Sequence, residues 1–322
     1  MTGQSLEVEE SSALTPQVSG DVLALAVRAG RHDGVKPLSE QTVLQARRLP
    51  DEASTPTSTH LVVRHPELGD VVAYGHVDEG DPDAPSAELV VDPDSRRQGI
   101  GGFLLDHVLR RWPQVRLWSH GDLQDARRLY TSRELVVVRE LWQMSRPLAG
   151  EWSELPEEVE LPEGMVVRPF RVGQDEQRWL DVNARSFARH AEQGRMTMAD
   201  LQDRQREPWF DPQGFLLLED QQDRDADGAP RLAGFHWTKV ESGPSGSTGE
   251  VYVVGVDPDY QGRGLGKLVT LLGLRHLRAR GVDTATLYVD GDNTAAIATY
   301  HRMGFERMAI DVMYAAKGTS AP

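Results

Sequence analysis

Apolar positions in the second half of the chain follow strand and helix periods in a regular order. Short runs rich in β-branched and aromatic residues predict strands over residues 214–219, 231–240, 250–256 and 284–290. Leucine and valine at three- and four-residue spacing predict an amphipathic helix over residues 263–280, with Gly281 as its stop. Asp292 is expected to cap a shorter helix that runs to about Met303 and ends at Gly304.

The first half repeats this order of elements. Strands are predicted over residues 61–64, 71–77, 88–91 and 115–118, and a helix over residues 102–112. Each half is therefore predicted to be a mixed unit of strands and helices, and the fold class is α/β.

An internal repeat indicates two copies of one fold. Residues 90–101 read VVDPDSRRQGIG, and residues 255–266 read GVDPDYQGRGLG. Matches on either side, including Tyr130 with Tyr300, keep the same order. Residues 148–164 are acidic, contain proline and lack a period, which predicts a linker between domains at residues 1–147 and 165–322.

Composition narrows the classes of function. The formal net charge of −15 argues against nucleic acid as a partner, because phosphate binding needs a basic face. The absence of cysteine excludes a disulfide scaffold, a thiolate metal site and a cysteine nucleophile. The chain shows neither a secretory signal at its start nor an apolar run of about 18 residues. We therefore expect a cytoplasmic protein.

Each repeat carries a glycine loop that follows a strand and an Asp-Pro pair and precedes an amphipathic helix. Unpaired N–H groups and the dipole at such a helix start favour an anion, and glycine lets the backbone approach it closely. The loops therefore predict pyrophosphate sites. They do not fit a P-loop, which requires Gly-Lys-Ser/Thr, or a dinucleotide-binding fold, which requires Gly-x-Gly-x-x-Gly.

The loops resemble the signature of the GNAT superfamily of acetyl-CoA-dependent N-acetyltransferases, Gln/Arg-x-x-Gly-x-Gly/Ala, at residues 96–101 and 261–266. The resemblance implies two tandem domains, each a mixed, mostly antiparallel sheet flanked by helices, with acetyl-CoA as cosubstrate and no metal. It places pyrophosphate on each loop and pantetheine along the preceding strand. The implied coenzyme contacts are Leu89, Val90, Val91, Arg97, Gln98, Gly99, Ile100, Gly101 and Gly102 in the first half, and Val254, Gly255, Val256, Gln261, Gly262, Arg263, Gly264, Leu265, Gly266, Lys267, Asn293, Thr294, Ala295, Ala296, Ile297 and Ala298 in the second.

A closer resemblance, to the actinobacterial mycothiol synthase family of tandem acetyltransferases, covers long stretches of the second half. It is carried by residues 190–194, 207–212, 236–239 and 249–258. The resemblance implies acetylation of the cysteinyl amine of a cysteine–glucosamine–inositol conjugate, the last step of mycothiol biosynthesis. It also implies substrate contacts from Glu40, Glu192, Lys239, Glu250 and Tyr288.

Acetyl transfer from a thioester to an amine needs a base for the amine and an acid for the departing thiolate. Glu250 opens the strand that leads into the second loop, so we expect it to be the base, on one face with Tyr252 and Val254. Tyr300 is the candidate acid, because the resemblance places a tyrosine near the coenzyme sulfur. Without the resemblance, the spacing favours a solvated strand end for Glu250 and a core aromatic for Tyr300.

The two halves differ at these positions. Counting back from Asp-Pro gives Glu250 in the second half but Pro85 in the first, and Leu123 replaces Asn293. We therefore expect the second domain to catalyse, and the first to be non-catalytic while it still binds acetyl-CoA. Glu88 is an alternative base in the first half, at a different strand position.

Two other functions fit the same features. A tandem acetyltransferase for an aminoglycoside or a protein N-terminus would share the fold and the base. A pair of acetyl-CoA-binding domains without catalysis would act as a sensor, although Glu250 and Tyr300 argue against this. We expect a monomer that binds acetyl-CoA and a small amine, with no nucleic acid or membrane partner.

Overall fold

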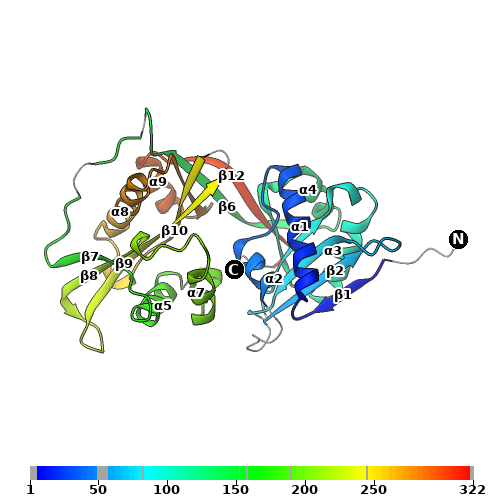
Figure 1. Cartoon of the computed structure of the whole chain (residues 1–322), viewed down its shortest axis with the longest axis horizontal. Coiled ribbons are helices and arrows are strands. Elements are labelled where there is room, and N and C mark those ends of the chain that lie inside the picture. The colour runs from blue at the N-terminus through cyan, green and yellow to red at the C-terminus, as the bar shows by residue number, and fades with distance from the viewer. Residues whose placement is uncertain are drawn as a thin grey trace. The chain divides into compact units, whose positions relative to one another are not determined.

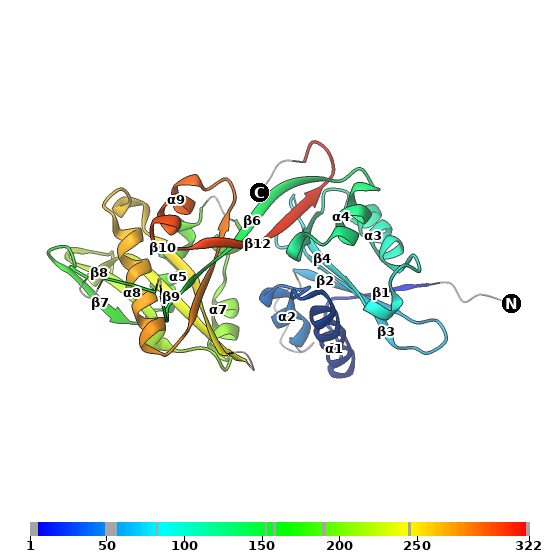
Figure 2. The same cartoon turned by 90° about the horizontal axis from the view of Figure 1, so that it is seen from above.

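The structure, a computed structural model, describes residues 6–48, 57–81, 83–151, 153–156, 159–188, 191–243 and 246–319. The chain forms two compact units (Figures 1 and 2). The first comprises Met1–Leu141 with Ala309–Ala321, and the second comprises Trp142–Met308. No helix within the described ranges is both long and apolar enough to cross a bilayer.

The first unit is a sheet flanked by helices. Its strands follow the order β1 (Val8–Ser11), β2 (Ser58–Arg64), β3 (Val71–Asp78), β4 (Ser86–Val91), β5 (Arg116–Ser119), β12 (Glu306–Ala315) and β6 (Val136–Pro147). Its helices are α1 (Pro16–Asp33), α2 (Glu40–Arg47), α3 (Ile100–Arg111) and α4 (Gln124–Thr131), with short turns of helix at η2 (Pro93–Ser95) and η3 (His120–Asp122). The pairs from β1 to β4 and the pair β5–β12 are antiparallel, whereas β4 and β5 are parallel.

The helices of the first unit cover opposite faces of its sheet (Figure 2). On one face, α1 contributes Leu25 to a buried cluster with Tyr74 and Val90. On the other face, α3 contributes Leu104 to a cluster with Ala87. β4 is therefore covered on both sides, which explains why four of its six residues are apolar.

The second unit repeats this plan. Its strands follow the order β6, β11 (Thr284–Asp290), β10 (Gly246–Val256), β9 (Pro230–Gly243), β8 (Phe215–Arg224) and β7 (Met165–Pro169). Its helices are α5 (Glu176–Ser186), α6 (Ala191–Gly194), α7 (Met198–Gln205), α8 (Leu265–Ala279) and α9 (Thr294–Arg302), with turns η4 (Pro212–Gly214) and η5 (Pro258–Tyr260). α5 and α7 pack on one face, and α8 and α9 on the other. β10 and β11 are parallel, and the pairs from β7 to β10 are antiparallel.

Two strands have residues in both units. β6 belongs to the first unit up to Leu141 and to the second from Trp142, whereas β12 passes from the second unit to the first after Met308. The end of β12 therefore pairs with β5. This division differs from the predicted domains at residues 1–147 and 165–322. The alternation within a strand reports its buried face but not its partner strand, so the sequence does not reveal this arrangement.

The segment predicted as a linker, residues 148–164, contributes to a core. Leu148 and Leu155 are buried in the same cluster as Leu274 and Phe305. The Leu148 N–H donates to the carbonyl of Asp283 at 2.8 Å. This segment thus packs on the second unit over its described residues, which exclude positions 152, 157 and 158.

Most predicted elements are present with shifted ends. The predicted strand 284–290 is β11, and the predicted helix 263–280 is α8. The predicted cap residue of α9 was wrong, because Asn293 and not Asp292 accepts the Ala296 N–H, at 3.1 Å. The prediction omitted the helices α1, α2, α4, α5, α6 and α7 and the strands β1, β6, β7 and β12.

Candidate active site

β10 and β11 diverge beside the second glycine loop. Their parallel pairing ends at Glu250 opposite Thr286. β10 continues to Val256, still paired with β9 on its other side. The β11-facing edge of residues 254–256 thus lies beyond the parallel ladder. Its backbone groups suit the extended pantetheine chain that the sequence predicts there.

Glu250 lies opposite Lys239 of β9 in the antiparallel register. Directly opposed residues project from the same face, so the carboxylate and the ammonium share one surface of the sheet. Lys239 is only 6% exposed. Its Nζ lies 3.0 Å from Glu241 Oε1, 4.9 Å from the centre of the Trp209 ring and 5.6 Å from that of Tyr252. The surface therefore offers an acceptor of protons beside a held cation, which suits an amine that also carries hydroxyls.

A β-bulge shapes this surface. The register of β9 and β10 shifts at Tyr252, between Val251 and Val253. The Tyr252 hydroxyl accepts a hydrogen bond from Arg204 Nε of α7 at 2.6 Å, and the Tyr252 ring lies 4.9 Å from that of Trp209. Sequence reasoning missed Arg204, because α7 and β10 are far apart in the chain and no motif links them.

The bulge also makes the predicted alternation of Glu250, Tyr252 and Val254 wrong. Val253 pairs with Trp237 in the cluster beneath α5 and α7. Val254 packs instead with the clusters on the α8 face. One extra residue in a strand reverses the faces of all residues that follow it.

Tyr288 and Tyr300 come from different elements. Tyr288 follows Thr286 by two residues, so it projects from the same face as Glu250, and it is 44% exposed. Tyr300 of α9 packs edge-on against Phe305, with ring centres 5.8 Å apart. Burial raises the pKa of Tyr300 to about 12, so the phenol keeps its proton at neutral pH.

The second glycine loop is open on its outer side. Gly262 and Gly264 have φ angles of 77° and 78°, which favour glycine. A Cβ added at either residue would meet nothing within 4 Å. Gly264 directly precedes α8, so the unpaired N–H groups and dipole of a helix start lie at the loop. The residues present therefore fit the predicted pyrophosphate.

The first glycine loop keeps this conformation with fewer glycines. Gly99 has a φ of 86° and precedes α3. Arg97 stands where the second loop has Gly262, with a φ of 63° that costs a non-glycine residue about 1–2 kcal/mol. Arg96 donates two hydrogen bonds of 2.7 Å to Asp33 of α1. These bonds help to offset the strain and hold the loop in place.

β4 and β5 of the first unit also diverge, after Glu88 opposite Trp118. Ser86 stands where the second unit has Glu250, because each is the sixth paired residue back from its loop. The sequence count pointed to Pro85, since it could not include the bulge. The first unit thus carries a hydroxyl where the second carries a carboxylate.

Glu88 is held by other groups of the first unit. The Ser39 N–H donates to Glu88 Oε2 at 2.8 Å, and Glu88 Oε1 lies 3.4 Å from His120 Nε2. His120 Nδ1 lies 3.2 Å from Asp311 Oδ2, and the other oxygen of Asp311 accepts the Gly121 N–H at 2.7 Å. The His120 imidazole, whose side chain is 15% exposed, therefore lies between two carboxylates.

The ion pairs and hydrogen bonds of Glu88 and His120 shift their pKa values more than desolvation does, so both groups are stabilised in their charged forms. Burial alone would raise the pKa of Glu88, but His120 and the Ser39 N–H together lower it to about 2. Burial likewise opposes the charged form of His120, but Asp311 and Glu88 raise its pKa to about 10. Glu88 is consequently too weak a base to take a proton from an amine at neutral pH.

The remaining predicted substrate contacts lie in short helices. Glu40 is the first residue of α2, after its cap Ser39, and is half-buried in the first unit. Glu192 lies in α6 of the second unit, but its side chain lies outside the described residues. Their roles stay predictions.

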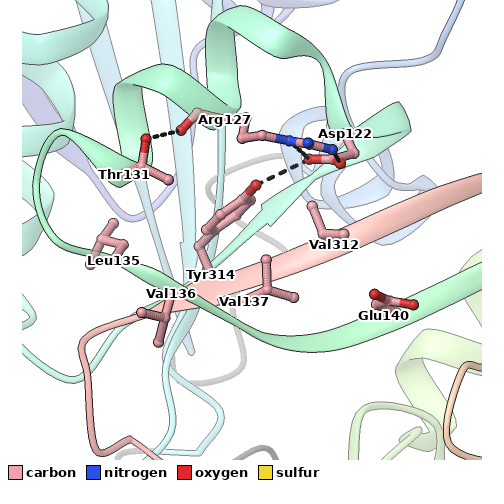
Figure 3. Close-up of a pocket in the computed structure, with 9 residues that line it drawn as sticks. All are labelled: Asp122, Arg127, Thr131, Leu135, Val136, Val137, Glu140, Val312 and Tyr314. Atoms are coloured by element: carbon pink, nitrogen blue, oxygen red, sulfur yellow. Dashed lines mark hydrogen bonds and ion pairs between the residues drawn. The ribbon is translucent and has the colours of Figure 1, made fainter.

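A cavity of about 420 Å³ lies in the first unit between α4, β6 and β12 (Figure 3). Its lining residues are Asp122, Arg127, Thr131, Leu135, Val136, Val137, Glu140, Val312 and Tyr314. The Tyr314 hydroxyl donates to Asp122 at 3.0 Å, and Arg127 pairs with the same carboxylate. None of the predicted coenzyme or substrate contacts lines this cavity, so it is not the candidate active site.

Comparisons with known proteins and family models test the fold. A model of the acetyltransferase (GNAT) family matches residues 178–305, and an acetyltransferase (GNAT) domain model matches residues 56–133. A tandem GNAT protein from the clavulanic acid biosynthesis pathway has a TM-score of 0.66 at 18% identity, covering 96% of this chain and 98% of that one. A GCN5-related N-acetyltransferase from Sphaerobacter thermophilus has a TM-score of 0.64 at 21% identity, covering 98% of each chain. The predicted tandem fold class is confirmed.

Relatives found by sequence identify the family more narrowly than the fold does. The mycothiol acetyltransferase of Kytococcus sedentarius is 53% identical over 301 residues, which cover 94% of this chain and 95% of the relative. That of Catenulispora acidiphila is 47% identical over 305 residues, covering 91% and 93%. Identity at this level over nearly the whole length confirms the predicted resemblance. The chain belongs to the mycothiol acetyltransferase family, a tandem GNAT family of acetyl-CoA-dependent N-acetyltransferases.

Proposed function

We propose that the second unit transfers the acetyl group of acetyl-CoA to the cysteinyl amine of the cysteine–glucosamine–inositol conjugate, which yields mycothiol. The name of the relatives supports this acceptor. The observation that carries the proposal is the opposition of Glu250 and Lys239 where β10 and β11 diverge, on the strand that leads into the second glycine loop.

Glu250 is the proposed base. The acceptor amine arrives as an ammonium and has to lose a proton before it attacks the thioester carbonyl. A carboxylate at the end of the parallel ladder is placed to take this proton, directly or through a water. The donors of the buried Lys239 ammonium suit sugar or inositol hydroxyls, and Trp209 and Tyr252 restrict its movement.

Tyr300 is the proposed acid. Cleavage of the C–S bond leaves a thiolate that needs a proton. The partly buried phenol is protonated at neutral pH, since desolvation raises its pKa to about 12. Burial that raises the pKa of Tyr300 also raises that of a thiolate formed in the same surroundings, so the proton transfer stays feasible. With no cysteine in the chain, we propose direct transfer within a ternary complex.

The first unit is proposed to bind acetyl-CoA without using it. Its loop keeps the φ angles of the second loop at Arg97 and Gly99. Its sheet has Ser86 where the base would stand, and Glu88 is neutralised by His120. The proposal therefore separates binding, which the backbone of the loop supports, from chemistry, which needs side chains that this unit lacks.

A turnover assay tests the function. The purified protein is supplied with acetyl-CoA and the cysteinyl glucosaminyl inositol conjugate, and in parallel with free cysteine, glucosamine and an aminoglycoside. Product is followed by chromatography with mass detection, because the acceptor and the released coenzyme both carry thiols. The conjugate is expected to have a kcat/KM at least about a hundredfold above the other amines, since they lack contacts that the site makes with its full substrate. Equal or higher activity on an aminoglycoside would contradict the proposed acceptor.

A further inference from the structure

The same ion pair occurs in both units, at the aspartate of the Asp-Pro pair before the glycine loop. In the second unit Asp257 is 0% exposed. Its Oδ1 accepts the Asp259 N–H at 3.0 Å and so caps the η5 turn that leads into the loop. Its Oδ2 pairs with Arg185 of α5, and Arg231 lies 3.6 Å from Oδ1.

The first unit builds this arrangement from its own residues. Asp92 is 7% exposed, and its Oδ1 accepts the Asp94 N–H at 3.1 Å, which caps η2. Its Oδ2 accepts hydrogen bonds of 2.9 and 2.5 Å from Arg28 of α1. Arg28 thus lies in α1 and Arg185 in α5, each of which is the longest helix on its face of the sheet.

The ion pair could serve the acceptor and the base, or it could serve coenzyme binding, and its recurrence in both units distinguishes these two roles. The first unit has Ser86 where the second has Glu250, and its Glu88 is paired with His120. A pair that served the acceptor or the base would have had no reason to persist there. The pair of Arg28 with Asp92 persists together with the glycine loop, which points to a role in coenzyme binding.

Electrostatics supplies the physical role. A buried carboxylate that precedes an anion site repels the pyrophosphate unless a cation neutralises it. The loop conformation requires the aspartate, because its other oxygen caps the turn that leads into the loop. The arginine therefore neutralises a charge that the geometry of the loop requires.

We propose that Arg185 and Arg28 are positioning residues for acetyl-CoA, each neutralising and orienting the aspartate that shapes the glycine loop of its own unit. This inference rests on the proposed function in one respect, namely that the two loops are coenzyme sites.

The test uses the full-length protein and calorimetric titration with coenzyme A, together with the KM for acetyl-CoA. Arg185→Met is expected to weaken one coenzyme site by about tenfold or more, and Arg28→Met the other. In Arg185→Met, the fold increase in the KM for acetyl-CoA should be at least several times larger than the fold increase in the KM for the amine. Arg206→Met is the matched control, because Arg206 pairs with Asp203 one turn away on the surface at 2.8 Å, and it should leave both coenzyme sites unchanged.

A double variant distinguishes charge neutralisation from a purely structural role. Asp257→Asn keeps an oxygen for the Asp259 N–H but removes the charge, so Asp257→Asn/Arg185→Met should recover most of the affinity that Arg185→Met loses. If Arg185→Met does not fold, the double variant and Arg185→Lys test the inference instead. The Kd of each for coenzyme A should lie within about threefold of the wild-type value. Unchanged affinity in folded Arg185→Met, or no recovery in the double variant, would overturn the inference. A wild-type protein that binds no coenzyme A would instead refute the assignment of the loops.

Discussion

Replacement of Glu250 by Gln gives the sharpest test of the proposed chemistry. Glutamine keeps the size and shape of the half-buried side chain but cannot take a proton from the acceptor amine. A positioned base contributes about 10²–10⁴ in rate, so kcat/KM should fall by about 10² or more, which corresponds to roughly 2.7 kcal/mol of transition-state stabilisation. Coenzyme affinity should stay within about twofold, because the loop is untouched.

Glu241→Gln is the charge-matched control for Glu250→Gln. Glu241 is the other carboxylate beside Lys239, 3.0 Å from its Nζ, with a side chain 48% exposed. Because the Lys239 side chain is only 7% exposed, loss of this pair should weaken acceptor binding and raise its KM, whereas kcat should change by no more than about fivefold, since Glu241 takes no proton from the amine. Initial rates across pH 6–9 compare both variants with wild type. If Glu250→Gln and Glu241→Gln lose similar activity, the effect is one of local charge, and Glu250 is not the base.

Four further predictions follow from the structure. Initial rates at varied concentrations of both substrates should give intersecting lines, as the proposed direct transfer requires; parallel lines would indicate an acetyl-enzyme. Valine at Gly99 and Gly101 should remove one calorimetric coenzyme site, by blocking the backbone approach at the first loop. Gly273→Ala should cost about 1–3 kcal/mol in urea unfolding despite the better helix propensity of alanine, since its Cβ would lie 2.2 Å from the ring of fully buried His236; an unchanged midpoint would refute this. The raised pKa of His120 gives a stabilisation that is complete below pH 6.5 and lost as pH rises through 10, so the melting temperature of wild type should fall across this window more steeply than that of His120→Gln.

The parts of the fold that sequence reasoning captured are those with a local signal. The period of α8 and the alternation of β11 depend on neighbouring residues, and both elements are where the pattern placed them. The glycine loops were visible because φ angles near 80° at Gly264 and Gly99 favour one residue type. The tandem architecture followed from two such loops in matching contexts.

The parts that escaped prediction depend on contacts between distant segments. The bulge at Tyr252 lies in a run of valine and tyrosine that looks continuous, and only the register with β9 reveals it. The hydrogen bond from Arg204 to Tyr252 and the bridge of His120 to Asp311 each join elements far apart in the chain. A side chain whose role is set by a distant partner leaves no local pattern to recognise.

The two units show why coenzyme binding and catalysis can separate in a duplicated domain. The loop is proposed to bind coenzyme through backbone groups, so it tolerates Arg97 in place of a glycine at a cost of about 1–2 kcal/mol. The base depends on one carboxylate at one register position, and that position is set by a bulge of a single residue in β10. On the proposed assignment, loss of the bulge or of Glu250 would remove the chemistry, whereas the loop and its ion pair would remain able to bind coenzyme. A duplicated copy released from catalysis is therefore expected to keep its coenzyme site longer than its active site, and this is the state that we propose for the first unit.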